Sequence, residues 1–426
     1  MEEEQNNIND NVATDAGEDR DSNLFKNRSF QLLWASGLLC SLAFSIFFLT
    51  QSWYVVDELK TPHFLGPILM VTAIPRIFMM IIGGVVADYY RRSSILFITN
   101  ILQALVACGI VFFLRMDSLS AVALLFFAFL FGFLDAFFWP AGNAMLPSLI
   151  KPHELVRANS LIQGSNQLAF IVGPMIAGFI LVRYGNNYVI PFLVVAILIF
   201  LGAILIHPRL IKDPFVEKKK EYRVMADLKE GIKYIRNIPI LLYCTLVAVI
   251  LNLFIFGSLI ISFPLFVDYL GGTALHLSYL ETSFAAGSFL AGLILAILNP
   301  SKKRGRLILY SLFAASLLLI LFSRITDINQ GIIIAGVIGL AAFAIIIPIM
   351  SLVQENTDSS KLGRVTGIIT IAFMGLEPLT YALISAALYL GISFTLVILF
   401  CGILATAATT WFLFKHHGTD KILNVD

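Results

Sequence analysis

Residues 83–92 have the sequence Gly-Gly-Val-Val-Ala-Asp-Tyr-Tyr-Arg-Arg, and they separate two long apolar runs at about 64–87 and 94–114. A helix of about 20 apolar residues is long enough to cross the hydrocarbon core of a membrane. A short turn with one acid and two arginines between two such runs is typical of a connection at a membrane surface. These residues therefore favour a membrane fold built from helices.

The composition of the chain supports the same fold class. Of the 426 residues, 58% are hydrophobic and 13% are charged, and the mean hydropathy is +0.87. Soluble domains have about 25% charged residues, so this chain has too few charges to cover a water-soluble surface. The composition excludes a soluble enzyme, a disordered protein and a nucleic-acid-binding protein, and it leaves a polytopic membrane protein.

Twelve apolar runs are long enough to be membrane-spanning helices, and we number these spans 1 to 12 in chain order. Within several residues, they lie at about 30–56, 64–87, 94–114, 119–146, 159–183, 188–206, 239–267, 276–298, 307–322, 331–353, 366–390 and 392–414. Six spans precede the only long connection, and six follow it. We therefore expect an all-α membrane protein with twelve transmembrane helices in two six-helix bundles, over 29–206 and 239–414.

The segments outside these bundles are polar. Residues 1–28 form an acidic tail that has eight acids and one base in its first 23 positions, a composition typical of disorder. In the linker 207–238, Leu228, Ile232 and Ile235 share one helical face. This spacing favours an amphipathic helix at the membrane surface, and the alternative is a merely solvated linker. Residues 415–426 form a second short tail.

The distribution of lysine and arginine predicts the orientation. If both termini are cytoplasmic, the inner connections and tails receive 24 of these residues and the outer connections receive four. Without the linker the ratio is still 15 to four. Because cytoplasmic loops carry an excess of lysine and arginine, we expect a multi-pass protein of the cell membrane with both termini in the cytoplasm.

The turn at 83–92 also resembles a known motif. Gly84, Asp88 and Arg92 fill the positions of the major facilitator signature between spans 2 and 3, although Tyr89 replaces a common basic residue and Arg91 a common glycine. The family resemblance implies that this turn, including Arg91 and Arg92, latches the two halves together on the cytoplasmic side. Its partner would be the start of span 11, at Gly363 and Arg364.

Further segments narrow the resemblance to one branch of the family. They are Trp139–Pro147, Gly173–Gly178, Glu281–Gly287 and Gly363–Val365. Together they resemble the branch that contains macrolide efflux proteins and the enterobactin exporter, over nearly the whole chain after residue 25. The family implies a transporter of two related halves that move about a site near the middle of the membrane.

Span 5 contains Gly173-Pro174-Met175-Ile176-Ala177-Gly178, which resembles an antiporter signature. Proline removes a backbone donor and bends a helix, and small residues let helices pack closely. The bend at Gly173, Pro174 and Gly178 has a purely structural kink as its alternative. Many drug–proton antiporters carry an arginine in span 4, but Phe131 stands there in this sequence, so a proton-coupling role is not transferred to that position.

Four charged residues lie within the apolar runs: Arg76, Asp135, Glu281 and Glu377. A charge at the bilayer centre costs at least roughly 2.5–3.5 kcal/mol, so each needs a partner, a water-filled cavity or a proton. Carboxyl groups removed from water can bind a proton near neutral pH. We expect Arg76 to pair with Glu377, or Glu377 to carry a proton when the halves separate. The alternative is a static pair that holds the fold.

Two roles are possible for each of the other polar residues within the spans. Asp135 either lines the cavity or caps nearby backbone. Glu281, which we place near the outer end of span 8, either pairs with Arg183 as an outer gate or is solvated at the interface. Gln163 and Asn166 follow helical spacing on span 5 with Asn159 and Gln167, and this face is expected to point to the central cavity or to span 8. Most of the 36 phenylalanines should face lipid or pack between helices.

Several kinds of chemistry have no motif in this sequence. It has no Gly-x-x-x-x-Gly-Lys-Ser/Thr loop for nucleotide phosphates, and His153-Glu154 lacks the second histidine of a zinc protease. We expect no metal site and no cofactor. The favoured function is a monomeric secondary transporter that exports a small amphipathic, macrolide-like compound by proton antiport. Export of a siderophore or another secreted metabolite is the alternative, and an intramembrane enzyme or a scaffold is less favoured.

Overall fold

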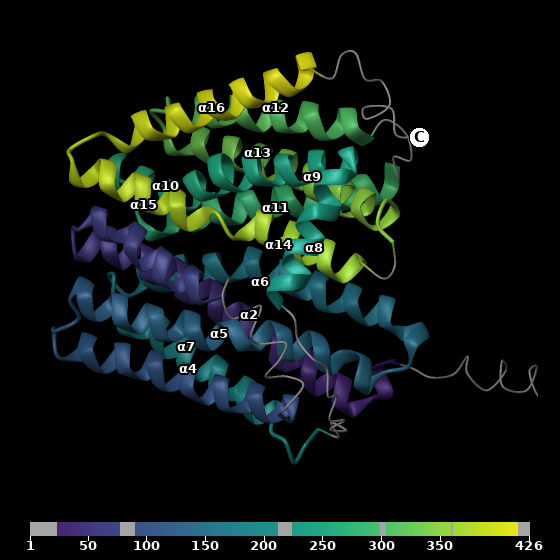
Figure 1. Ribbon diagram of the computed structural model, residues 1–426. Coiled ribbons are helices and arrows are strands. Elements are labelled where there is room, and N and C mark those ends of the chain that lie inside the picture. Colours follow the sequence, from purple (N-terminus) through teal and green to yellow (C-terminus); the bar gives the residue numbers. More distant parts are fainter. Residues whose placement is uncertain (1–23, 77–89, 212–223, 299–303, 359–360, 416–426) are drawn as a thin grey trace, which may run out of the picture.

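The computed structural model describes residues 24–76, 90–211, 224–298, 304–358 and 361–415. These residues form helices and short turns and contain no strand. Figure 1 shows the helices lying side by side in two groups, with the N-terminal half of the sequence in one and the C-terminal half in the other. Residues 1–23, Gly84 and Asp88 lie outside the described residues.

The N-terminal bundle begins with α2 (Arg28–Trp53), whose first turn is capped by the Asn27 side chain, and α2 continues into the π-helical segment η3 (Tyr54–Glu58). A short 3₁₀ turn, η4 (Pro62–Phe64), leads into a helix over residues 65–76. The bundle is completed by α4 (Arg92–Arg115), α5 (Ala121–Leu149), α6 (Leu155–Arg183) and α7 (Val189–Leu205).

The linker holds α8 (Val224–Asn237), and span 7 follows as α9 (Pro239–Ile250), the π-helical segment η6 (Leu251–Phe256) and α10 (Gly257–Tyr269). The remaining helices are α11 (Ala274–Leu298), α12 (Arg304–Phe322), α13 (Ile328–Glu355), α14 (Leu362–Met374), α15 (Glu377–Tyr389) and α16 (Phe394–Lys415). We call the end of the molecule with connections 59–61, 116–120, 184–188, 270–273, 323–327 and 390–393 the outer end, and the opposite end the inner end, after the orientation expected from the charges.

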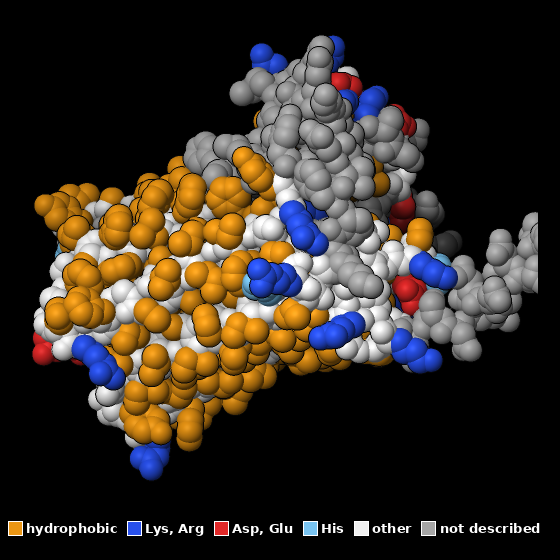
Figure 2. Space-filling model, turned by 90° about the horizontal axis from the view of Figure 1, so that it is seen from below, with side chains coloured by type: hydrophobic (Ala, Val, Ile, Leu, Met, Phe, Trp, Pro, Cys, Tyr) orange, Lys and Arg blue, Asp and Glu red, His pale blue; other side chains and the backbone are white. Residues whose placement is uncertain are grey.

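The prediction of an all-α membrane protein with two bundles is confirmed. Within the described residues, ten helical segments are long and apolar enough to cross a membrane, and Val189–Leu205 is a shorter apolar helix. With the helix of residues 65–76 these segments are consistent with twelve crossings. On the face seen in Figure 2, hydrophobic side chains cover much of the left and lower surface, as expected for a surface in contact with lipid.

The two bundles repeat the same helix packing. In the N-terminal bundle α4 packs against α5 and α7, and in the C-terminal bundle α12 packs against the corresponding helices α13 and α16. A close backbone approach is also repeated: a Cβ on Gly132 would lie 2.3 Å from the Thr72 carbonyl oxygen, and a Cβ on Gly339 would lie 2.1 Å from that of Phe284. Both glycines join the fourth helix of a bundle to its second, which is the pattern of duplicated halves.

One span differs from the sequence-based expectation. Instead of one continuous helix, span 11 consists of α14 and α15, which are separated at Gly375 and Leu376. The interruption has a local cause, because Pro378 has no N–H to donate to the carbonyl of Met374. Its ring also disfavours helical backbone at the preceding residue. Pro378 thus contributes to the break, which places Glu377 at the first turn of α15.

Candidate functional site

A cavity of about 420 Å³ lies between the two bundles. It is lined by α2, α6 and the helix of residues 65–76 from one half, and by α10, α11, α13, α14 and α15 from the other. The lining residues are Phe44, Ser45, Phe48, Leu69, Thr72, Ala73, Arg76, Gln167, Phe170, Pro174, Ile260, Phe263, Glu281, Phe284, Ala285, Ser288, Phe343, Met374, Glu377 and Tyr381. A volume of this size is typical of sites for small molecules.

Aromatic rings form much of the cavity wall. In the N-terminal half, Phe44 makes ring contacts with Phe48 at 6.2 Å and with Phe170 at 6.4 Å between centroids. In the C-terminal half, Phe263 and Phe284 meet edge to face at 6.2 Å. Because apolar walls with a few polar groups bind amphipathic ligands, this lining suits a compound with a large apolar body.

Arg76 and Asp135 form a partly buried ion pair. The Arg76 Nε lies 3.1 Å from Oδ2 of Asp135, and its Nη2 also donates to that oxygen. Asp135, on α5, is only 7% exposed, and the Arg76 guanidinium lies 4.9 Å from the centroid of the Phe44 ring. The structure thus differs from our expectation of an Arg76–Glu377 pair, because Asp135 is the acid that the guanidinium reaches.

Glu377 is held by neutral donors instead. The Nδ2 of Asn252 lies 3.0 Å from Oε1 of Glu377, and the Tyr381 hydroxyl donates to Oε2 at 2.9 Å. Asn252 belongs to the π-helical segment η6, and such segments are frequent at functional sites. Our sequence analysis missed this residue, although an asparagine within the apolar run of span 7 was a signal for it.

The Asn252 side chain also satisfies the backbone at the break in span 11. It donates to the Phe373 carbonyl at 2.6 Å, and its oxygen accepts from the N–H of Leu376 at 2.9 Å. Helix ends leave backbone groups without partners inside the helix, and such groups are unfavourable in a membrane. One amide therefore closes the ends of α14 and α15 and positions the carboxyl between them.

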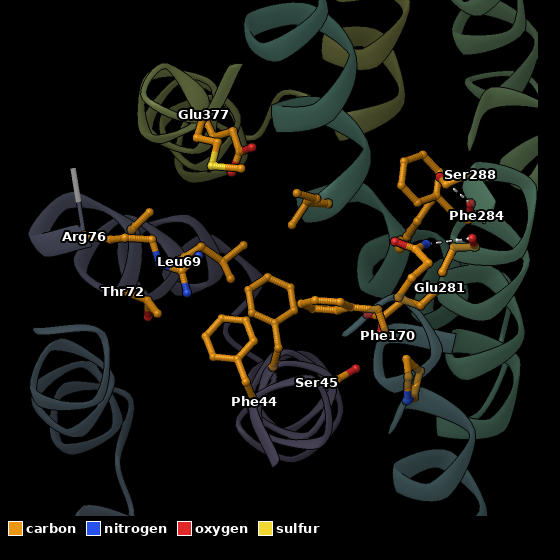
Figure 3. A pocket seen from close by; sticks show the side chains of 18 of the residues that line it. Phe44, Ser45, Leu69, Thr72, Arg76, Phe170, Glu281, Phe284, Ser288 and Glu377 are labelled. Carbon is orange, nitrogen blue, oxygen red and sulfur yellow. Dashed lines mark hydrogen bonds between the residues drawn. The ribbon is translucent and has the colours of Figure 1, made fainter. Parts of the chain in front are cut away.

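Glu281 lies beside the cavity rather than at an outer gate. It lies on α11 and lines the cavity, together with Phe284 one turn further on. In Figure 3, Glu281 lies on one side of the cavity, and Arg76 and Glu377 lie on the other. The expected Glu281–Arg183 pair is not among the ion pairs of the described residues, and the Arg183 guanidinium lies 5.9 Å from the Tyr184 ring centroid.

Of the polar residues on span 5, some line the cavity and others do not. Gln167 lines the cavity and donates to the Ala285 carbonyl of α11 at 3.0 Å, so it joins the two halves. Asn166 is buried inside the N-terminal bundle and accepts from the Ser41 hydroxyl at 2.9 Å. Gln163 is exposed and lies outside the cavity lining. Neither Gln163 nor Asn166 therefore lines this cavity, and Gln167 does.

The Gly-Pro segment lies within α6, which is one helix from Leu155 to Arg183. A Cβ on Gly173 would lie 2.6 Å from the Ser45 side chain of α2, and a Cβ on Gly178 would lie 2.7 Å from Ser278 of α11. Both glycines thus permit close helix packing, and Pro174 lines the cavity. The expected bend at Gly173, Pro174 and Gly178 stays a prediction.

An ion cluster joins the two halves at the outer end. Lys60 lies 3.5 Å from Asp57 of the N-terminal half and 3.6 Å from Asp268 of the C-terminal half. Asp57 also accepts from Asn186 at 2.8 Å and from the Tyr188 hydroxyl at 2.7 Å. Nearby, the Gly66 N–H donates to Ser385 across the halves at 3.0 Å. The sequence analysis missed this cluster, because its members are far apart in the chain.

At the inner end, Arg364 pairs with Glu230 of the linker helix α8 at 2.8 Å. Arg91 immediately precedes α4 and makes no side-chain capping hydrogen bond, and Arg92 is the first residue of α4. Gly363 has no atom within 4 Å of the place its Cβ would take. Because Gly84 and Asp88 lie outside the described residues, the latch between this turn and span 11 stays a prediction. The described residues contain no group of three His, Cys, Asp or Glu that could hold a metal ion.

Comparisons with known proteins agree with this architecture. The family model described as Major Facilitator Superfamily matches residues 33–376. Macrolide efflux protein A of Streptococcus pyogenes is 24% identical over 347 residues, which cover 79% of this chain and 83% of that protein. Enterobactin exporter EntS of Escherichia coli O1:K1 is 26% identical over 301 residues, 68% of each chain.

Solved structures show the same fold at low identity. A crystal structure of the nucleoside transporter NupG matches with a TM-score of 0.73 and 12% identity, covering 90% of this chain and 99% of that one. A bacterial homologue of the human lysosomal transporter Spinster, in an inward-facing and unoccupied conformation, matches with a TM-score of 0.63 and 14% identity, covering 91% and 95%.

Proposed function

Because this chain belongs to the major facilitator superfamily, we propose that it is a secondary transporter that exports a small amphipathic compound by proton antiport. The observation that carries this proposal is the aromatic cavity between the two bundles, with ionisable groups on its wall. The relative named macrolide efflux protein A supports an export direction and a macrolide-like substrate. The relative named enterobactin exporter EntS supports the alternative, a siderophore or another secreted metabolite.

We assign the proton to Glu377. A carboxyl in the interior of a membrane needs a partner or a proton, and the partners of Glu377 are an amide and a phenol, which carry no charge. Arg76 is compensated by Asp135, so Glu377 has no direct ion pair among the described residues. Each proton that moves inward through 100 mV supplies roughly 2.3 kcal/mol for export.

The halves are proposed to rock about the cavity in alternating access. The cluster at Lys60, Asp57 and Asp268 and the contact of Gly66 with Ser385 would close the outer path in the present state. At the inner end, Gly84, Asp88, Arg91, Arg92, Gly363 and Arg364 remain the proposed latch for the opposite state. The protein would act as a monomer in the cell membrane, with both termini in the cytoplasm.

The test is transport into energised inside-out vesicles with a panel of macrolides, other amphipathic drugs and catecholate siderophores. We expect accumulation of at least one amphipathic drug, and we expect it to stop when the pH gradient is collapsed. Glu377→Gln should abolish the dependence on this gradient, whereas Glu58→Gln, at an exposed outer position, should not. Accumulation that is insensitive to the gradient in the wild type would remove proton antiport.

A further inference from the structure

We propose that Glu281 and the neighbouring phenylalanines form a subsite for the positively charged group of a lipophilic cation, such as an amphipathic amine or onium compound. This inference rests on the proposed function, since it names the substrate class of the same cavity. It separates the roles of the two carboxyls in the cavity wall: Glu281 contacts the ligand, and Glu377 carries the proton.

The first argument is that Glu281 has no compensating group in the protein. Among the described residues it makes no hydrogen bond and no ion pair, although Glu377, Asp135 and Asp57 all have such partners. The helices that pack against α11 are α2, α6, α10 and α13, and their charged residues lie only near their ends. A carboxylate without a partner is unfavourable inside a membrane, and a bound cation or a proton would relieve that cost.

The second argument is the balance of charge in the cavity. Arg76 is the single basic residue of the described lining, and Asp135 neutralises it through two hydrogen bonds. Glu281 and Glu377 remain as acids without a basic partner. An anionic ligand would meet no uncompensated positive charge among these residues, whereas a cation would meet a carboxylate. The cavity therefore favours cations over anionic catecholates, and it selects the drug-like substrate over the siderophore alternative.

The third argument is the aromatic surface beside Glu281. Phe284 lies one helical turn from Glu281 on α11, and its ring packs edge to face against Phe256 at 6.0 Å and Phe263 at 6.2 Å. Cations are attracted to the faces of aromatic rings, and the apolar body of the ligand can pack on the same rings. Across the cavity, the Arg76 guanidinium already makes this kind of contact with Phe44 at 4.9 Å. An acid flanked by phenylalanines is thus complementary to a cation with apolar substituents.

The experiment is equilibrium binding to the full-length protein in nanodiscs. Radiolabelled tetraphenylphosphonium is the cationic probe, tetraphenylborate is the anionic probe of the same shape, and triphenylphosphine oxide is a smaller neutral probe with three of the same phenyl groups. We expect Glu281→Gln to weaken tetraphenylphosphonium binding by at least about tenfold, the lower end of the effect of a close charge pair, with little change for the neutral probe. Glu281→Asp should retain part of the affinity, and the matched control Glu58→Gln should bind as the wild type does.

Three results would overturn the inference: unchanged tetraphenylphosphonium binding in Glu281→Gln, an equal loss for the cationic and neutral probes, or tighter binding of tetraphenylborate in the wild type. The equal loss would assign Glu281 to the structure of the cavity wall. Because binding is measured without a gradient, the result is separable from the proposed function. If the protein binds cations selectively but transports nothing, the proposed function is wrong and the subsite stands. If it exports drugs with the gradient but Glu281 has no role, the subsite is wrong and the proposed function stands.

Discussion

The side-chain amide of Asn252 binds the carboxyl of Glu377 and both helix ends that flank it. Its nitrogen lies 3.0 Å from Oε1 of Glu377 and 2.6 Å from the Phe373 carbonyl oxygen, and its oxygen accepts from the N–H of Leu376 at 2.9 Å. Span 7 therefore fixes the interruption of span 11 through a single side chain. The position of the proposed proton carrier depends on a residue that carries no charge.

Asn252→Ala should destabilise the protein and impair proton-coupled transport. The substitution leaves buried backbone groups at the break without partners, at about 1–3 kcal/mol for each unsatisfied group. We expect a lower midpoint of thermal unfolding in detergent and a loss of gradient-driven export. Asn329→Ala, at an exposed position of α13, is the matched control and should change neither. A normal pH dependence of export in Asn252→Ala would show that Glu377 does not need Asn252 to carry the proton.

The Arg76–Asp135 pair should behave as a unit in a double-mutant cycle. Neutralising one member leaves the other as an unpaired charge in the membrane interior; this costs about 3–5 kcal/mol for a fully buried charge and less for Arg76, whose side chain is 29% exposed. We expect Arg76→Gln and Asp135→Asn each to lower the unfolding midpoint strongly, and the double variant to recover most of the loss. Thermal unfolding followed by tryptophan fluorescence measures this. Simple addition of the two single effects would contradict a direct pair.

The outer cluster should control how often the outer end opens. Asp268→Asn removes the link from Lys60 to the C-terminal half, and because the Lys60 side chain is 65% exposed, the link is worth only about 0–1 kcal/mol. A small energy of this kind still shifts an equilibrium between two states by up to roughly fivefold. We expect a larger open population in spin-label distance measurements across the outer end. High salt should produce a similar shift in the wild type, since it screens exposed charges, and it should have little further effect in Asp268→Asn.

Two glycines of α6 offer a matched test of the packing between the halves. A Cβ at Gly178 would lie 2.7 Å from Ser278 and 2.8 Å from the Ala274 carbonyl oxygen of α11, whereas nothing lies within 4 Å of a Cβ at Gly164. We expect Gly178→Ala to weaken closure of the outer end and to reduce export. Gly164→Ala should stabilise the helix by about 0.5–1 kcal/mol and preserve export. Equal export by the two variants would show that α6 and α11 do not need this close contact.

The fold could be predicted because its signal is local. Runs of about 20 apolar residues and the positions of lysine and arginine define spans and connections without any knowledge of packing. The break in span 11 was not predicted, because a proline such as Pro378 need not interrupt a helix: Pro174 and Pro348 lie inside continuous helices. The charged residues within the spans could be identified from the same apolar runs, and Arg76, Glu281 and Glu377 all line the cavity, although Glu281 was expected at the outer end of span 8.

The partners of these groups could not be predicted, because they depend on helix rotation and depth. The sequence analysis paired Arg76 with Glu377, and only the packing of α5 against the helix of residues 65–76 shows that Asp135 is the acid that Arg76 reaches. Gln163 and Gln167 lie one turn apart on the same face of α6, so their spacing cannot say which of them is level with the cavity. The outer cluster combines residues at or beside three separate connections, which no sequence pattern brings together.

Because span 11 is interrupted, α14 and α15 are two separate helices that meet at one hinge. The inner helix, α14, contacts the linker helix α8 through the Arg364–Glu230 ion pair and through Ile368, which packs against Gly231. The outer helix, α15, contacts the opposite half, where Ser385 accepts from the Gly66 N–H. A force on the linker should therefore displace the hinge, which lies next to the Glu377 carboxyl. We expect the transport rate to respond to the lateral pressure of the surrounding lipid, and vesicles of graded curvature stress would measure that response.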